Sequence, residues 1–200
     1  MKMNSLERLL VNNPVRTWML RQLALDLLAR HAVSLSGKRV LEIGCGQGSG
    51  TELLLRDCGA DKVFAFDYDP RQLNRAKQRH RAHGIGGTCL FVGDGERLPF
   101  ANEQFDVIVE FAILHHMPGW RLAVSEIARV LRPGGILVYE EYLERFVANP
   151  VVLRLLDHPR EGWFKAEAFY DALTGAGLRP MPPQRHLGNY WLAGTAERIN

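Results

Sequence analysis

The sequence predicts an α/β fold in which a mostly parallel sheet carries helices on both faces. Short apolar runs alternate with helical patterns along the chain, and this alternation is typical of parallel sheets. Glycines and acids follow several of the predicted strands, at the ends where ligands bind in such sheets. The 200 residues suit one domain, and a hydrophobic content of 46% with a net charge of +3 is ordinary for a globular protein.

The first predicted elements are a helix and a buried strand. From Val15 to about Ala32 the pattern is helical, and Ser36-Gly37 then ends it. Arg39–Ile43 follows as the first strand. The apolar residues of the helix fall near one stripe: Val15, Trp18, Met19, Leu23, Leu27 and Leu28.

Local capping signals place the next two helices. Ser49 followed by Glu52 fits a capping box, so a helix should run from about Gly50 to Cys58. Asp69 is a good N-cap and Pro70 suits the first helical position, so a second helix should end near His83. The strands predicted beside these helices are Lys62–Phe66, Thr88–Val92 and Phe105–Phe111.

The C-terminal part is harder to assign. A helix from Gly119 to Leu131 should end at Pro133-Gly134-Gly135, and Ile136–Tyr139 should form the fifth strand. Prolines at 180, 182 and 183 interrupt the tail, so we expect its last one or two strands to be abbreviated. Two further helices are predicted between these segments, at Val151–Leu156 and about Lys165–Ala176.

The glycine-rich stretch Val40–Thr51, VLEIGCGQGSGT, predicts a nucleotide-type ligand site. It does not fit the dinucleotide fingerprint G-x-G-x-x-G, because Ser49 or Thr51 falls at the sixth position in the two possible frames. An acid ahead of the glycines would repel a pyrophosphate and suits a cationic amine instead. The pattern that fits is E-x-G-x-G-x-G, formed by Glu42, Gly44, Gly46 and Gly48.

Two more acids complete the predicted ligand. Asp67 ends the second strand, where a carboxylate can accept hydrogen bonds from both ribose hydroxyls. Asp94 follows the third strand and could accept from an adenine amino group, with the N–H of Gly95 beside it for a ring nitrogen. Tyr68 could cover the adenine face. A ligand with an adenosine and an amino-acid end but no phosphates is S-adenosylmethionine, whose product after methyl loss is S-adenosylhomocysteine.

These motifs resemble those of class I S-adenosylmethionine-dependent methyltransferases of the small single-domain type, which are similar to quinone-biosynthesis and small-molecule methyltransferases. The resemblance covers residues 38–142 through VLEIGCGQG, VFAFDYDP, GDGERLPFANEQFDVIVE, ILHHMP and LRPGG. It implies a three-layer Rossmann-like sheet of order 3-2-1-4-5-7-6 with strand 7 antiparallel. It also implies a cofactor-binding set of Glu42, Gly44, Cys45, Gly46, Gly48, Asp67, Tyr68, Asp94, Gly95 and Phe111.

On this reading the chain is a single methyltransferase domain with three parts. Residues 1–36 form an N-terminal helical cap, residues 37–142 the cofactor-binding core, and residues 143–200 a lid segment, a helix and terminal strands. These parts should close over a small organic acceptor, to which a methyl group is transferred by in-line displacement. Candidate pocket residues are Trp18, His115, Trp163 and Phe164.

Methyl transfer mainly requires that two reactants be aligned and desolvated, so the catalytic residues are the least determined. His115 and His116 follow the fourth strand, and one of them could act as a general base or only contact the acceptor. Glu140 and Glu141 end the fifth strand on opposite faces, so we expect one of them to face the pocket. The candidate catalytic residues are His115 and Glu141.

Other classes of function are less well supported by the sequence. An RNA or other macromolecule methyltransferase is one alternative, but the basic run Arg71–His83 has no interleaved aromatic residue for base stacking. A non-catalytic cofactor-binding module is another. DNA is not expected as a partner and RNA is unexpected. The N-terminus does not predict a membrane span, and no Cys/His cluster has metal spacing. Three scattered cysteines predict free thiols in the cytoplasm, and we expect a monomer or weak homodimer.

Overall fold

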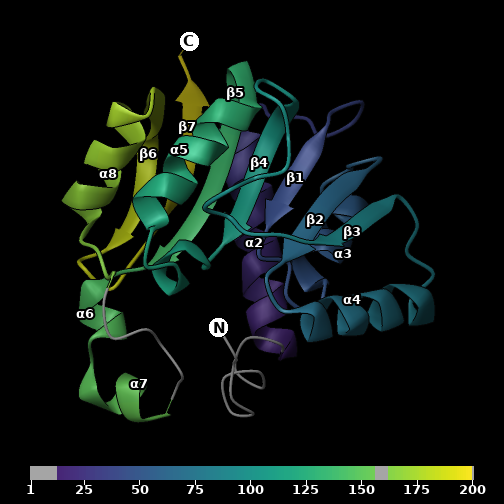
Figure 1. Cartoon of the computed structure of the whole chain (residues 1–200), viewed down its shortest axis with the longest axis horizontal. Helices are drawn as coiled ribbons and strands as arrows, with labels where there is room; N and C mark the ends of the chain where they lie inside the picture. Colours follow the sequence, from purple (N-terminus) through teal and green to yellow (C-terminus); the bar gives the residue numbers. More distant parts are fainter. Residues whose placement is uncertain (1–12, 156–161, 200) are drawn as a thin grey trace.

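A seven-stranded sheet forms the centre of the protein. The computed structural model describes residues 13–155 and 162–199. The strand order is β3-β2-β1-β4-β5-β7-β6, as predicted, with β7 antiparallel to both of its neighbours and the other pairs parallel (Figure 1). The strands are β1 (Val40–Ile43), β2 (Val63–Asp67), β3 (Thr88–Val92), β4 (Phe105–Phe111), β5 (Leu131–Tyr142), β6 (Leu178–Leu187) and β7 (Trp191–Arg198).

Helices cover both faces of this sheet (Figure 1). One face packs against α2 (Pro14–Arg30), α3 (Ser49–Arg56) and α4 (Pro70–Ala82), and the other against α5 (Trp120–Val130) and α8 (Ala166–Gly175). Three short helices lie beyond the carboxyl ends of the parallel strands: η1 (Leu114–His116), α6 (Glu144–Val147) and α7 (Pro150–Leu155). Within the described residues no helix is both long and apolar enough to cross a bilayer.

The capping box predicted for α3 is wrong. The N-cap is Gly48, with a left-handed φ of 78° and no side-chain cap. Glu52 instead points toward α4, where its carboxylate accepts from Arg79 Nε at 2.7 Å and lies 2.9 Å from His83 Nδ1. The acid therefore joins two helices, because an ionic partner on the neighbouring helix competes with the local backbone amide.

The expectation of abbreviated terminal strands is also wrong. The proline-rich segment forms β6, which spans ten residues, and β7 spans eight. β6 is an edge strand, where the N–H groups that proline lacks are not needed for pairing with a further strand. Its pairing with β7 shifts register between Met181 and Arg185, across the remaining prolines.

The apolar stripe predicted for α2 is only partly correct. The residues that face the sheet are Leu20, Leu23, Ala24, Leu27 and Leu28. Val15, Trp18 and Met19 lie on the opposite side and are 66%, 61% and 56% exposed. The first two turns of α2 therefore present an apolar surface to solvent.

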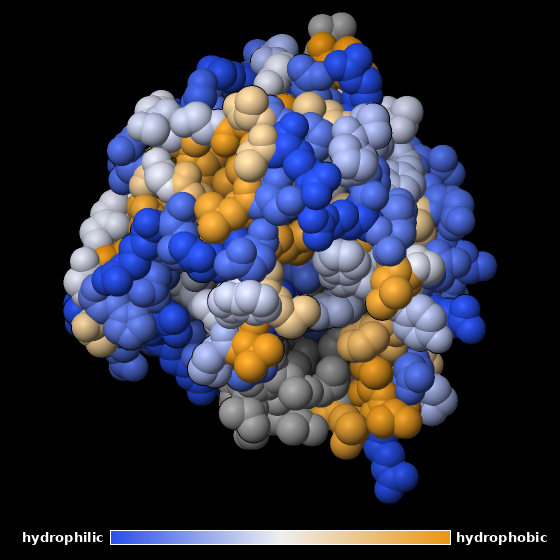
Figure 2. Space-filling view, turned by 180° about the vertical axis from the view of Figure 1, so that it is seen from behind, coloured by the Kyte–Doolittle hydropathy of each residue, from blue (hydrophilic) through white to orange (hydrophobic). Residues whose placement is uncertain are grey.

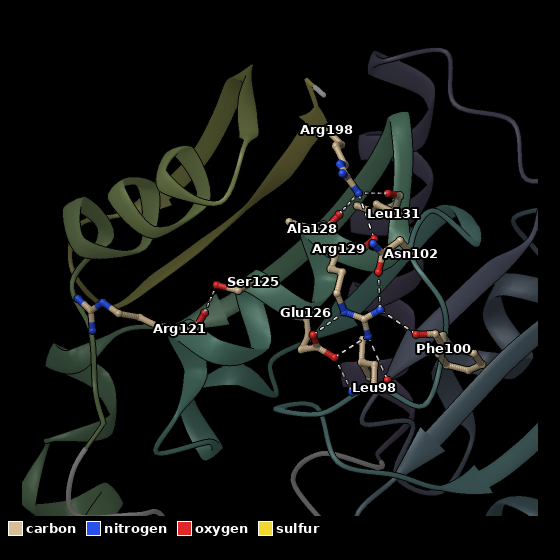
Figure 3. Close-up of polar contacts among 10 residues, drawn as sticks. All are labelled: Leu98, Phe100, Asn102, Arg121, Ser125, Glu126, Ala128, Arg129, Leu131 and Arg198. Atoms are coloured by element: carbon tan, nitrogen blue, oxygen red, sulfur yellow. Dashed lines mark hydrogen bonds and ion pairs between the residues drawn. The ribbon is translucent and has the colours of Figure 1, made fainter.

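Two arginines, Arg129 and Arg198, hydrogen-bond to the backbone of the segment between β3 and β5. Arg129 on α5 donates to the carbonyls of Leu98 and Phe100 and pairs with Glu126 (Figure 3). Arg198 on β7 donates to three carbonyls around the α5–β5 junction. The loop that follows Asp94 is thus held against α5 by charge-assisted hydrogen bonds.

Candidate functional site

The loops that follow β1 and β2 meet at the carboxyl edge of the sheet. Gly46 donates its N–H to Asp67 Oδ2 at 2.9 Å, and Cys45 donates its N–H to the carbonyl of Phe66 at 2.8 Å. The other oxygen of Asp67 accepts from the N–H of Asp69 at 2.8 Å. Burial raises the pKa of Asp67, and the two amide hydrogen bonds partly offset that effect. The predicted ribose acid thus shapes the glycine loop itself.

The two sides of the glycine loop differ. Gly46 has a left-handed φ of 52°, and a Cβ built there would meet no atom within 4 Å. Gly48 also has positive φ, but a Cβ there would lie 2.5 Å from His80 Nε2. One side of the loop is therefore open for a ligand to lie against bare backbone, while the other is packed against α4.

His80 on α4 supports the packed side of this loop. Its side chain is buried, and Nε2 lies 3.0 Å from the carbonyl oxygen of Gly48. The same oxygen accepts the N–H of Glu52 at 3.0 Å. Nδ1 has no hydrogen-bond partner among the described residues. His80 was not predicted from the sequence, because it lies within the basic run Arg71–His83. The one signal of its burial is its helical spacing from Leu73 and Ala76, which are buried on the same face.

Glu42 lies buried at the base of the loop. Thr51 on α3 donates its hydroxyl to the Glu42 carboxylate, and a Cβ at Gly50 would collide with the other carboxylate oxygen. Burial raises the pKa of Glu42 to about 7, against a lowering by Thr51 and a further rise due to Asp67. Glu42 is therefore poised between its neutral and ionised forms near neutral pH.

The residues predicted to hold adenine lie at the ends of β2 and β3. Tyr68 is 67% exposed, and Asp94 is also exposed, with Oδ1 accepting from the N–H of Glu96 at 3.0 Å. Gly95 is buried, and a Cβ there would lie 2.7 Å from Met117 Cε. The structure thus brings these residues to the same edge as Asp67, with Tyr68 and Asp94 still open to solvent.

A buried histidine–carboxylate pair follows β4. Nδ1 of His115 lies 2.6 Å from Glu141 Oε2, and their side chains are 2% and 0% exposed. The other oxygen of Glu141 accepts the N–H of Leu114 at 2.6 Å. Glu110 lies fully buried beside this pair, and burial together with the Glu141 carboxylate raises its pKa well above the usual range. The two residues predicted as catalytic are therefore in direct contact.

Glu140 points to the opposite face of the sheet, as strand alternation predicts. Its carboxylate binds Arg16 of α2, and the indole N–H of Trp191 donates to it at 2.9 Å. The backbone carbonyl of Glu140 accepts the N–H of Ala112, directly after Phe111, at 2.7 Å. Glu140 therefore ties α2 and β7 to the carboxyl edge. Sequence reasoning did not find Arg16 as its partner, because the two residues are 124 positions apart.

Two of the candidate pocket residues lie elsewhere. Trp18 faces solvent on α2, as described above. Phe164 is 3% exposed and packs on Trp120, with ring centroids 4.4 Å apart, and on Phe169, at 5.4 Å. It belongs to the core between α5 and α8, since those helices leave an aromatic-sized space there. The prediction that Trp18 and Phe164 line the pocket is therefore corrected: Trp18 faces solvent and Phe164 lies in the core.

The raised pKa of Glu42 predicts a pH-dependent stability. The folded protein retains a proton that the unfolded chain releases above its ordinary pKa of 4.5. The free energy of unfolding should therefore fall as the pH rises from 4.5 to about 7, by up to about 3 kcal/mol. Urea titrations of the wild type and of Glu42→Gln across this range measure the difference. A wild-type curve parallel to that of Glu42→Gln would contradict the prediction.

The contact between His80 and Gly48 predicts local protection of the glycine loop. His80→Phe removes the donor, so opening of the loop should become easier by about 1 kcal/mol. Hydrogen exchange of the Gly48 and Glu52 amides should accelerate about fivefold in this variant. His80→Gln is the matched control, since its amide can still donate to the carbonyl. Equal exchange rates in the Phe and Gln variants would show that the hydrogen bond does not hold the loop.

Comparison with known proteins finds a methyltransferase domain within the chain. Residues 41–139 match the family described as methyltransferase domain. A probable phthiotriol/phenolphthiotriol dimycocerosates methyltransferase 2 of Mycobacterium ulcerans is 42% identical over 107 residues, which cover 54% of this chain and 40% of that protein. A fatty-acid O-methyltransferase of Mycolicibacterium smegmatis is 36% identical over 110 residues, which cover 55% and 39% respectively. The chain thus matches about two fifths of the length of these curated relatives.

Solved structures extend the likeness to the whole chain. The structure of a SAM-dependent methyltransferase from Aquifex aeolicus superposes with a TM-score of 0.70 at 18% identity and covers 94% of this chain and 95% of its own. At this identity the likeness shows the fold, including the region beyond residues 41–139. The sequence match thus shows a methyltransferase domain at residues 41–139, and the superposition shows that the chain shares the fold of the Aquifex aeolicus protein.

Proposed function

We propose that the chain binds S-adenosylmethionine at the carboxyl edge of the sheet and transfers its methyl group to a small organic acceptor by in-line displacement. The observation that carries this proposal is the open backbone at Gly46, which donates its N–H to the half-buried carboxylate of Asp67. A ligand that lies on this backbone is within reach of an acid suited to a ribose and of Glu42, an acid suited to an ammonium group.

The donor set fits this cofactor. Each oxygen of Asp67 accepts one amide N–H, and a carboxylate has about four lone-pair sites, so acceptor capacity remains for two ribose hydroxyls. Glu42 and Asp67 place two acids at the loop, which disfavours a pyrophosphate. The residues that would hold the cofactor are Glu42, Gly44, Cys45, Gly46, Gly48, Asp67, Tyr68, Asp94, Gly95 and the backbone near Phe111.

Besides cofactor binding, the reaction requires that the methyl donor and the acceptor be aligned and that the acceptor lose one proton. When bound, the sulfonium cofactor supplies an activated methyl group and a neutral leaving group. His115 takes the proton that the acceptor loses, and Glu141 acts as a positioning residue that fixes the imidazole ring. Glu141 also accepts the Leu114 N–H, so the same carboxylate fixes the His115 ring relative to the loop after β4.

The relatives support an acceptor of lipid character. One carries phthiotriol/phenolphthiotriol dimycocerosates in its name and the other a fatty acid. The matches to these relatives cover 54% and 55% of this chain, and the family match covers residues 41–139, which hold the predicted cofactor contacts, so the comparisons support the methyl donor more strongly than the acceptor.

Asp67→Ala tests the cofactor assignment. Loss of the carboxylate removes two charge-assisted hydrogen bonds to ribose, so the Kd of S-adenosylhomocysteine should rise about a hundredfold. Isothermal titration measures it, with Asp171→Ala on the exposed side of α8 as the matched control. The cofactor assignment fails if the wild type does not bind S-adenosylhomocysteine at high micromolar concentration. An unchanged affinity of Asp67→Ala would refute the ribose assignment alone.

Substitution of the buried pair tests the role of His115. In His115→Ala, kcat should fall by about two orders of magnitude or more, while the Kd of S-adenosylhomocysteine stays unchanged. Glu141→Gln should lower kcat about tenfold, since the ring loses the carboxylate that orients it. His116→Ala is the control beside it. A kcat of His115→Ala within about threefold of the wild type would show that His115 only contacts the acceptor.

A further inference from the structure

The exposed side of α2 is apolar in its first two turns. Val15, Trp18 and Met19 are spaced at i, i+3 and i+4, so they share one helix face. Each is more than half exposed, although buried leucines occupy the opposite face of the same helix. These apolar side chains do not contribute to the core that the helix forms with the sheet.

A second exposed apolar group lies on α7. Val151 is 63% exposed and Leu155 47% exposed, and no residue of this helix is buried. We call Val15, Trp18, Met19, Val151 and Leu155 together the apolar rim. Figure 2 shows hydrophobic atoms low on the rear face of the molecule, the end at which Figure 1 places α7 and the start of α2.

The apolar rim is fixed next to the candidate site. Arg16, one residue after Val15, binds Glu140 near the end of β5. The segment that carries α6 and α7 continues directly from that strand, and Leu143 donates its N–H to Tyr190 at 3.0 Å. The rim therefore flanks the carboxyl edge of the sheet, where the acceptor enters.

The charge around the rim is positive. On α2, Arg16 is paired with Glu140 and Arg21 with Asp57, so the positive charge at this side of the rim comes from Arg154, which is exposed on α7. Arg145 on α6 is also exposed, and it lines a hollow of about 480 Å³ together with Lys165 and Glu144, which form an ion pair at 3.9 Å. Apolar side chains with a tryptophan, flanked by basic residues, are typical of segments that lie in a lipid interface.

We propose that the apolar rim docks the protein onto an anionic lipid surface, from which the acceptor passes directly to the carboxyl edge of the sheet. The rim side chains enter the headgroup region, and Arg145 and Arg154 contact anionic headgroups. This inference deepens the proposed function, on which it rests for the fate of the acceptor. Docking itself can be measured without methyl transfer.

Vesicle co-sedimentation tests the docking. The wild type should sediment with vesicles of equal parts phosphatidylcholine and phosphatidylglycerol, and binding should weaken with added salt or with phosphatidylcholine alone. Met19→Glu and Val151→Glu should each lower the partition coefficient about tenfold, since each replaces an apolar contact with the lipid by a charge. Leu122→Glu is the matched control, because Leu122 is 60% exposed on α5, on the other face of the sheet.

Tryptophan fluorescence supplies a second readout. Lipids brominated on the acyl chain should quench the wild type, and Trp18→Phe should reduce that quenching, because Trp18 is exposed while Trp120 is buried and Trp163 and Trp191 are half-buried. No sedimentation of the wild type with the anionic vesicles would overturn the proposal. An equal loss of vesicle binding in Met19→Glu and Leu122→Glu would also overturn the proposal. S-adenosylhomocysteine titration of the same variants separates this result from the proposed function, since docking variants should bind it like the wild type.

Discussion

The hydrogen bond from the Gly46 amide to the Asp67 carboxylate is the interaction on which the candidate site depends. It joins the turn after β1 to the end of β2, two strands that already pair in parallel. The turn can approach the acid because it is built of glycines, and the acid can hold the turn because its remaining oxygen is tied to the Asp69 amide. The loop and the second strand therefore set the shape of the ligand surface together.

Buried acids accumulate at the same edge, and each is stabilised differently. Glu42 accepts from a threonine, Glu140 pairs with an arginine, and Glu141 contacts a histidine. Glu110 contacts Glu141 and has no cationic partner among the described residues, so burial and the Glu141 carboxylate raise its pKa well above the usual range. An ionised carboxylate in such a setting is costly unless it is paired. The edge as a whole favours a cationic or neutral ligand over an anionic one.

The sheet, its strand order and most element boundaries could be predicted from the sequence, because they depend on local signals. The apolar run into a glycine turn, the N-cap at Asp69 and the strand alternation at Glu140 and Glu141 all act within a few residues. The errors occurred where a distant residue competes with a local pattern. Glu52 leaves its capping position for Arg79, and the prolines of β6 are accommodated because that strand lies at the sheet edge.

The sequence alone determined the methyltransferase domain and the strand order, and it predicted a set of cofactor contacts, since a glycine turn and strand-end acids have little freedom in a parallel sheet. Tertiary structure decided which side chains meet. It placed His80 under Gly48 and Arg16 on Glu140, and it joined His115 to Glu141 across 26 positions of the chain. It also turned Trp18 outward, because a helix on a sheet buries one face and the sequence of α2 is apolar on both.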